Sequence, residues 1–297
     1  MKVLVTGANG LIGSHTCRAL RASGYDVLTC GRSGPQSSSH YVGDLLDPDF
    51  RSRIMRNERP DGLIHLAWQT KHGYFWNAPD NADWRVASID LLDRFLEIGG
   101  TRAVLAGSCA EYDWTISEIG KKTCETDACV PGTLYGQEKL KLAQHCQNLI
   151  DQGSSIAWGR FFLLCGPGEY PARFVPAVTK ALLAGEAAKM SSGKQVRDFM
   201  HVEDAGAAFA SVFESTFNGI LNVASGEAHS LLSVANSLQQ LIGRGQVSAG
   251  SLPDRPDDPP YLVADTSILH DKIGFEPKYN LATALESCIQ WWRSQTD

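Results

Sequence analysis

Two residues of the 297-residue chain have types and spacing that suit proton transfer to an oxygen atom. Tyr135 and Lys139 lie four positions apart, so a helix places both side chains on one face. A nearby ammonium favours the phenolate, so Lys139 is expected to lower the pKa of Tyr135 below its usual value of about 10. Such a tyrosine can exchange a proton with an alcohol or carbonyl while hydride moves at the carbon. The alternative is an ordinary surface helix face.

A glycine-rich turn, Thr6–Gly13, follows the first apolar run and opens a helical pattern. Gly7 allows a tight turn, Gly10 lets backbone amides approach a pyrophosphate, and Gly13 lets the helix pack closely on the strand. The partial positive charge at the helix N-terminus also favours a phosphate. Because the motif stands between a strand and a helix, it predicts a dinucleotide site rather than a plain turn.

The end of the second expected strand bears on which dinucleotide binds. An acidic residue there would bond a ribose 2′-hydroxyl, whereas an arginine suits a 2′-phosphate. The chain has Arg32 and Ser33 at this place and no acid. We therefore expect NADP(H) to be favoured and NAD(H) to remain possible; the alternative for Arg32 is a solvated loop charge.

Strand and helix patterns alternate through the first 165 residues or so, which predicts an α/β fold with a doubly wound parallel sheet. Beyond Gly166 the pattern is broken, which suggests a small α+β substrate-binding cap. We expect a Rossmann domain over 1–168, to which 197–225 returns, and a cap over most of 169–297. The expected strands cover 2–5, 26–30, 63–67, 103–106 and 155–164, and the main helices cover 14–23, 51–56, 84–98 and 135–150.

Composition narrows the class of protein. The chain is 43% hydrophobic and 20% charged, as in globular proteins, and its net charge of −6 argues against a nucleic-acid binder. No apolar run approaches the ~20 residues of a membrane helix, and no targeting signal is recognised. The eight cysteines form no CxxC pair. We therefore expect a reducing, cytoplasmic location and no metal site, since Cys124 and Cys129 lack further ligands at suitable spacing.

Several further motifs strengthen these expectations, and together with the two above they span the chain. The sequence resembles the extended short-chain dehydrogenase/reductase family, in the branch acting on nucleotide sugars. The motifs that carry the resemblance are Thr6–Gly13, Gly43–Leu45, His65–Ala67, Gly107–Tyr112, Tyr135–Lys139, Arg160–Gly168, Arg197–Asp204 and Arg255–Asp258.

The resemblance implies a role for each matching position. Tyr135 would be the acid/base, and Lys139 would bind the nicotinamide ribose. Arg197 and Arg255 would clamp the sugar-nucleotide diphosphate, for which the guanidinium fork is suited, unless they form structural salt bridges with Asp198 or Asp257. The resemblance also implies a homodimer through helices 84–98 and 135–150. Asp44 and Leu45 would contact the adenine, Asn9, Leu11, Ile12, Leu66, Ala67 and Phe162 would line the cofactor cleft, and Phe174 would lie on the substrate side.

Some positions depart from the family pattern. The hydroxyl residue expected to touch substrate falls on Cys109, and a thiol is a poorer donor, so we expect Ser108 to take that role. The dehydratases of the family use acidic residues just after this hydroxyl; here Ala110 is inert but Glu111 is available, and the alternative for Glu111 is a purely structural role. Leu163 and Cys165 replace the usual Asn and Tyr, which alters the expected substrate contacts.

Aromatic residues crowd the segment from Trp68 to Trp84. They could stack on a sugar or base, but a core or dimer contact is the favoured interpretation. His65 and His201 lie in apolar runs and are expected to be hydrogen-bonded core residues.

The leading hypothesis for function is reduction of a nucleotide-linked 4-keto-6-deoxy sugar, with Tyr135 protonating the oxygen. The first alternative is a 4-epimerase with tightly bound NAD, and the second is a 4,6-dehydratase that uses Glu111. A redox-sensing binding module without turnover is the non-enzyme alternative, which the intact Tyr135 and Lys139 disfavour.

Overall fold

A seven-stranded parallel sheet forms the centre of the protein, which a computed structural model describes over residues 1–295. The strand order is β11-β6-β5-β4-β1-β2-β3. The direction of winding reverses between β1 and β4, which is where open α/β sheets bind ligands at the carboxyl ends of their strands. The strands are β1 (Lys2–Thr6), β2 (Asp26–Gly31), β3 (His40–Val42), β4 (Gly62–His65), β5 (Arg102–Ser108), β6 (Ile156–Phe161) and β11 (Gly219–Val223).

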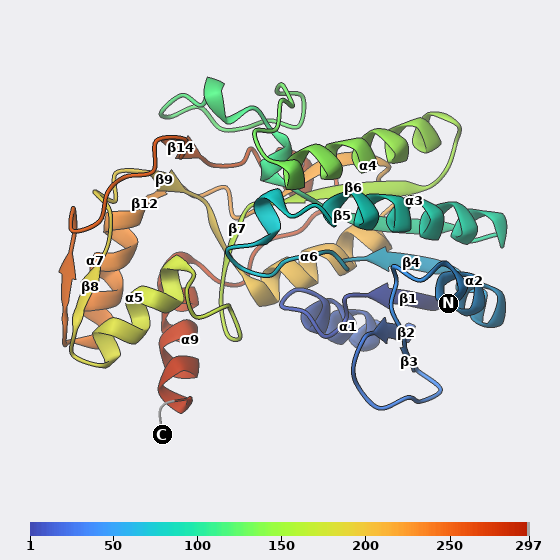
Figure 1. Ribbon diagram of the computed structural model, residues 1–297, viewed down its shortest axis with the longest axis horizontal. Helices are drawn as coiled ribbons and strands as arrows, with labels where there is room; N and C mark the ends of the chain where they lie inside the picture. The colour runs from blue at the N-terminus through green and yellow to red at the C-terminus, as the bar shows by residue number, and fades with distance from the viewer. Residues whose placement is uncertain (296–297) are drawn as a thin grey trace.

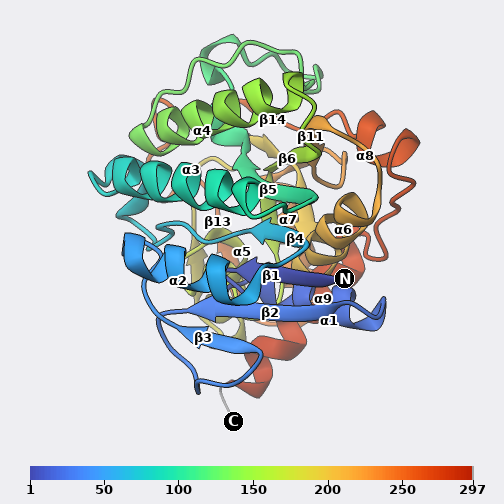
Figure 2. The same ribbon diagram turned by 90° about the vertical axis from the view of Figure 1, so that its right-hand side faces the viewer.

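Helices cover both faces of this sheet (Figures 1 and 2). Alternate strand residues point to opposite faces, so Val3 and Val5 pack on one side and Leu4 on the other. The first face is covered by α1 (Gly13–Ala22) and α6 (Val202–Glu214), which pack against each other. The second is covered by α2 (Pro48–Glu58), α3 (Asn81–Glu97) and α4 (Leu134–Asp151). The doubly wound architecture expected from the sequence is therefore confirmed.

The remaining elements form a smaller body beside the carboxyl ends of the strands, at the left of Figure 1. Its core lies between three helices, α5 (Phe174–Leu183), α7 (Leu231–Ile242) and α9 (Leu281–Ser294). Around them are the short strands β7 (Leu163–Cys165), β8 (Ala187–Lys189), β9 (Val196–Arg197), β10 (Phe199–His201), β12 (His229–Ser230), β13 (Gln246–Ser248) and β14 (Tyr261–Leu262). One further helix, α8 (Ser267–Asp271), packs on β11 of the main sheet.

The strand expected over 155–164 is two strands in different sheets. β6 pairs with β5 and β11, whereas β7 pairs with β10. The chain leaves the main sheet at Phe162 and continues as β7, which connects the sheet to the cap. An apolar run through such a junction shows no break in hydrophobicity, since both parts are buried.

Three properties bear on the classes of site considered from the sequence. All eight cysteines are free thiols. Within residues 1–295 there is no cluster of three or more histidine, cysteine or acidic residues able to hold a metal ion. No helix in the described part of the chain is long and apolar enough to cross a membrane.

Candidate active site

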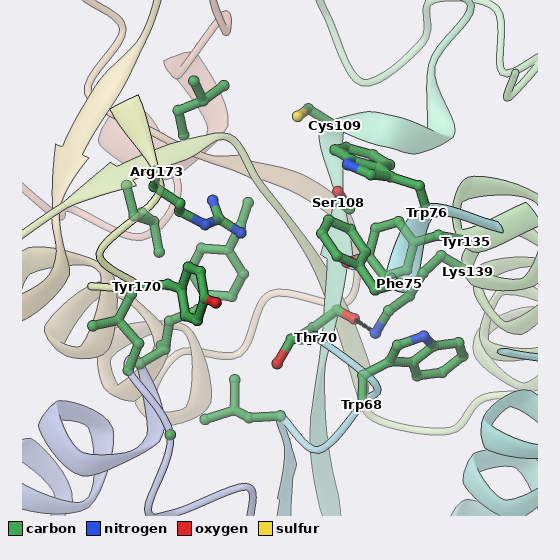
Figure 3. Close-up of a pocket in the computed structure, with 18 of the residues that line it drawn as sticks. Trp68, Thr70, Phe75, Trp76, Ser108, Cys109, Tyr135, Lys139, Tyr170 and Arg173 are labelled. Atoms are coloured by element: carbon green, nitrogen blue, oxygen red, sulfur yellow. Dashed lines mark hydrogen bonds between the residues drawn. The ribbon is translucent and has the colours of Figure 1, made fainter. Parts of the chain in front are cut away.

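A cavity of about 1730 Å³ lies between the carboxyl edge of the main sheet and the cap. Figure 3 shows Tyr170 and Arg173 on the cap side of it, facing Ser108, Tyr135 and Trp76. Of the residues expected at the site, the cavity wall contains Gly7, Asn9, Gly10, Leu11, Ile12, Gly13, Arg32, Ser33, Asp44, Leu45, Leu66, Ala67, Ser108, Cys109, Tyr135, Lys139, Phe162, Arg197 and Arg255.

The turn after β1 has the geometry that a bound diphosphate needs. Gly7 has φ of +67°, and a Cβ there would lie 2.8 Å from the backbone nitrogen of Ala67. A Cβ on Gly13 would collide with the carbonyl oxygen of Gly7. The N-cap of α1 is Ile12, which supplies no side-chain hydrogen bond. The Ser14 and His15 amides bond the carbonyl oxygens of Gly10 and Ile12, so within the described residues the amides of Leu11–Gly13, just before them, are the ones left for an anion.

The end of β2 lies at the far end of the same cavity, together with the segment that follows β3. Arg32, Ser33 and Asp44 all line it. The Asn9 amide donates to the carbonyl oxygen of Ser33 at 3.4 Å, which ties the glycine turn to the Arg32 loop. Asp44 accepts a hydrogen bond from the backbone of Leu46, which fixes the position of this carboxylate. These groups could hold the adenosine half of a dinucleotide, as the sequence predicts.

The Tyr135–Lys139 pair lies on the first turns of α4, which is capped by the Thr133 hydroxyl. The Lys139 ammonium donates to the carbonyl oxygen of Ala106 at 2.7 Å. Burial lowers the pKa of Lys139 to about 7. Burial also raises the pKa of Tyr135, and the Ser108 side chain only partly opposes this rise.

The expectation that Lys139 lowers the pKa of Tyr135 is therefore corrected. Loss of water around the phenol outweighs any effect of the ammonium, which is held instead by a β5 carbonyl.

The segment after β5 places Ser108 and Glu111, two of the expected site residues, in different surroundings. The Ser108 hydroxyl accepts from the backbone of Ala110, and Ser108 and Cys109 line the cavity. Glu111 is fully buried outside the cavity wall, and its carboxylate receives hydrogen bonds from Trp158 and from Arg160 at 2.8 Å. The expectation that Glu111 is available to a substrate is thus wrong, because the short helical turn Cys109–Glu111 directs it into an ion pair. Burial raises the pKa of Cys109 to about 12, so this group is a thiol rather than a thiolate.

Of the three residues expected on the substrate side, Arg197 and Arg255 line the cavity and Phe174 does not. Arg197 is buried and pairs with Asp258 at 2.6 Å, a partner different from the two considered above. It nevertheless lines the cavity, as does the exposed Arg255. Phe174 does not line it: this first residue of α5 stacks on Phe199 in the cap core, which corrects its assignment to the substrate side.

Aromatic side chains between β4 and α3 surround Tyr135. The rings of Trp68, Phe75 and Trp76 stand nearly perpendicular to that of Tyr135, at centroid distances of 6.4, 5.0 and 5.9 Å. Trp68 and Phe75 are buried, as a core role predicts, but all three also line the cavity. The clustering of aromatics was visible in the sequence, whereas their contact with a residue sixty positions away was not. Further cavity residues that the sequence did not single out individually are Thr70, Trp114, Glu169, Tyr170 and Arg173.

The two histidines in apolar strands are hydrogen-bonded core residues, as expected. His65 bonds the hydroxyls of Thr6 and Ser88, and burial lowers its pKa to about 3. His201 stacks on Tyr279 and contacts the Ser287 hydroxyl at 3.2 Å. Neither lines the cavity, so neither is a proton donor there, whereas Tyr135 lies in the cavity wall together with Ser108.

Comparisons with known proteins agree with this geometry. Residues 3–224 match the model of the NAD dependent epimerase/dehydratase family. A UDP-glucose 4-epimerase from Azospirillum brasilense is 28% identical over 99% of this chain and 92% of its own length. A dTDP-6-deoxy-L-talose 4-dehydrogenase (NAD(+)) from Aggregatibacter actinomycetemcomitans is 24% identical over 78% and 87% of the two lengths. The solved structure of MoeE5 with UDP-glucuronic acid and NAD superposes with a TM-score of 0.84, with 27% identity and coverage of 99% and 100%.

Proposed function

The chain belongs to the NAD dependent epimerase/dehydratase family, and we propose that it catalyses hydride transfer at carbon 4 of a nucleoside-diphosphate sugar. The observation that carries this proposal is the meeting of Ser108, Tyr135 and Lys139 in one cavity with the glycine turn. A proton-transfer group thus lies within the same space as the cradle for a redox dinucleotide. The fit of that cradle rests on the uncapped N-terminus of α1 and on the positions where a Cβ would collide.

When bound, NAD(P) would supply or accept the hydride. The protein's own residues then do three things. The amides of Leu11–Gly13 hold the diphosphate, and Tyr135 gives or takes the proton of the sugar oxygen. Ser108 orients that oxygen by hydrogen bonding, and the Lys139 ammonium binds the nicotinamide ribose. Arg197 and Arg255 lie on the cap side, where they can neutralise the sugar-nucleotide diphosphate.

Two versions of this reaction have separate support. A 4-epimerase, in which hydride leaves and returns to the other face, is supported by the names of most of the similar proteins. A reductase of a 4-keto-6-deoxy sugar is supported by Arg32 and Ser33 at the end of β2, which suit NADP(H) as an exchangeable co-substrate. A talose 4-dehydrogenase among the similar proteins acts on a related deoxy sugar by its name. The burial of Glu111 disfavours a dehydratase.

Purified protein should be assayed in two ways. Conversion of UDP-glucose to its 4-epimer without added cofactor supports the epimerase, since the NAD must then travel with the protein. Oxidation of NADPH on addition of a dTDP-4-keto-6-deoxy sugar supports the reductase. A protein that binds neither cofactor would contradict both versions.

Tyr135→Phe tests the mechanism shared by the two versions. It removes the proton donor, so kcat should fall by about 10²–10⁴-fold while the Kd for the cofactor stays unchanged. Tyr74→Phe is a matched control, because Tyr74 is exposed and lies outside the cavity wall. Near-normal kcat in the Tyr135 variant would reject the assignment.

A further inference from the structure

The Lys139 side chain is an ammonium with few conventional partners. It is only 3% exposed, and within the described part of the chain its one hydrogen bond is to the carbonyl oxygen of Ala106. No ion pair within residues 1–295 includes Lys139. An ammonium removed from water without a counter-charge is costly, so another group must stabilise it.

The indole ring of Trp68 lies against the ammonium, where a counter-charge would otherwise be expected. The ammonium nitrogen lies 3.9 Å from the centroid of the Trp68 ring, and 5.8 Å from the more distant ring of Trp158. A cation over the face of an indole is attracted by the ring's quadrupole, and tryptophan is the strongest of the aromatic residues in this respect. The contact is desolvated, since Trp68 is 8% exposed, which increases its strength.

The ring of Trp68 is held in place from its other side. Its Nε1 donates to the side-chain oxygen of Asn81 at 2.7 Å. The Asn81 amide donates in turn to the carbonyl oxygens of Phe75 and Ala78, at 2.7 and 2.9 Å, and Asn81 is completely buried. Rotation of the indole would leave these buried groups unpaired, at a cost of about 1–3 kcal/mol each.

We propose that Trp68, locked by Asn81, is a positioning residue that keeps Lys139 charged and directs its ammonium toward the reaction cavity. Two sides of the ammonium are taken by the Ala106 carbonyl and the indole face, so its remaining N–H group is left for a ligand in the cavity. The edge contact of Trp68 with Tyr135 places both members of the pair against one rigid ring.

The other groups that act on Lys139 come from every element around it. Glu111, after β5, favours the charged form, as does the Cys146 side chain on α4. Burial first, and then the same ammonium, lower the pKa of His65 on β4, so His65 stays neutral. Burial opposes the charge and lowers the pKa of Lys139 to about 7. Near neutral pH, a small loss of stabilisation would therefore change the charge of this residue.

The titration of Lys139 tests this proposal without any substrate. The ε-carbon signal of ¹³C-labelled lysine is followed against pH in the full chain, and Lys139→Arg identifies the signal. Trp68→Leu should lower the titration midpoint by about one pH unit, because the cation loses the ring face. Trp68→Phe, with a weaker face, should lower it by less. Trp84→Phe is the matched control: Trp84 lies 6.5 Å from Trp68 but makes no cation–π contact with Lys139.

Midpoints in the Trp68 variants equal to that of Trp84→Phe would overturn the proposal. If Trp68→Leu does not fold, Trp68→Phe against Trp84→Phe decides the question. The consequence for turnover rests on the function proposed above: the fall of kcat/KM at high pH should move to lower pH by the same amount as the titration. A shifted titration in a protein that turns over no sugar nucleotide would reject the proposed function and leave the role of Trp68 intact.

Discussion

The two sides of the cavity are built in different ways. On the cofactor side, one turn between β1 and α1 provides backbone amides and glycines, so eight consecutive residues specify the diphosphate cradle. On the sugar side, side chains come from separate segments, among them Trp76 after β4, Trp114 after β5 and Arg173 before α5. A site formed by backbone groups can be recognised in one stretch of sequence, whereas a site formed by side chains depends on how distant segments pack.

Neighbouring residues can also differ in whether they reach the cavity, as four residues at the end of β5 show. Ser108 and Cys109 face the cavity, and Glu111 turns away to pair with Arg160. A capping arrangement causes this, since the Glu111 carboxylate also accepts from the backbone nitrogen of Ser108 at 2.7 Å. Closeness in sequence to a catalytic position therefore does not put a side chain into the site.

Glu111→Gln should produce the largest change in stability. It leaves the Arg160 guanidinium as an uncompensated buried charge, and breaking such a pair costs about 3–5 kcal/mol. Urea unfolding should show this loss, with Glu118→Gln as a control because Glu118 is exposed in the same segment. A variant of normal stability that loses turnover would instead return Glu111 to the catalytic groups.

Gly13→Ala should have the next largest effect, and it acts on the cofactor side. The added Cβ meets the Gly7 carbonyl, so either α1 or the turn must shift, at a cost of about 1–3 kcal/mol. The shift also misplaces the amides that receive the diphosphate, so the rise in melting temperature on adding NADH or NADPH should disappear. In Gly132→Ala, the Cβ meets nothing within 4 Å, and this variant should keep its stability. An undiminished cofactor response in Gly13→Ala would place the dinucleotide elsewhere.

These differences explain how much could be predicted from the sequence. Alternating strand and helix patterns predicted the parallel sheet and five of its seven strands, but not β3 and β11. The sequence motifs predicted the glycine turn and the Tyr135–Lys139 pair. The sequence did not predict the junction at Phe162, the ion pair that holds Glu111 away from the cavity, or the packing of Phe174 in the cap core. Each depends on contacts between distant segments, and so does the wall of aromatics around Tyr135. The pKa of Tyr135 was missed for a related reason, because burial depends on the whole fold.

Arg32→Ala should give the smallest effect, and it tests which of the two coenzymes the cofactor side prefers. If the guanidinium receives a 2′-phosphate, its loss should raise the Kd for NADPH about tenfold, which is about 1.4 kcal/mol, and leave the Kd for NADH unchanged. Fluorescence titration of both coenzymes measures this, with Arg53→Ala as a control since Arg53 is exposed on α2 and lies outside the cavity wall. Because ion pairing with phosphate weakens with salt, the difference between the coenzymes should also shrink at high ionic strength. Equal losses for both coenzymes would mean that Arg32 holds the shared adenosine half, and NAD would then be the expected partner of this turn.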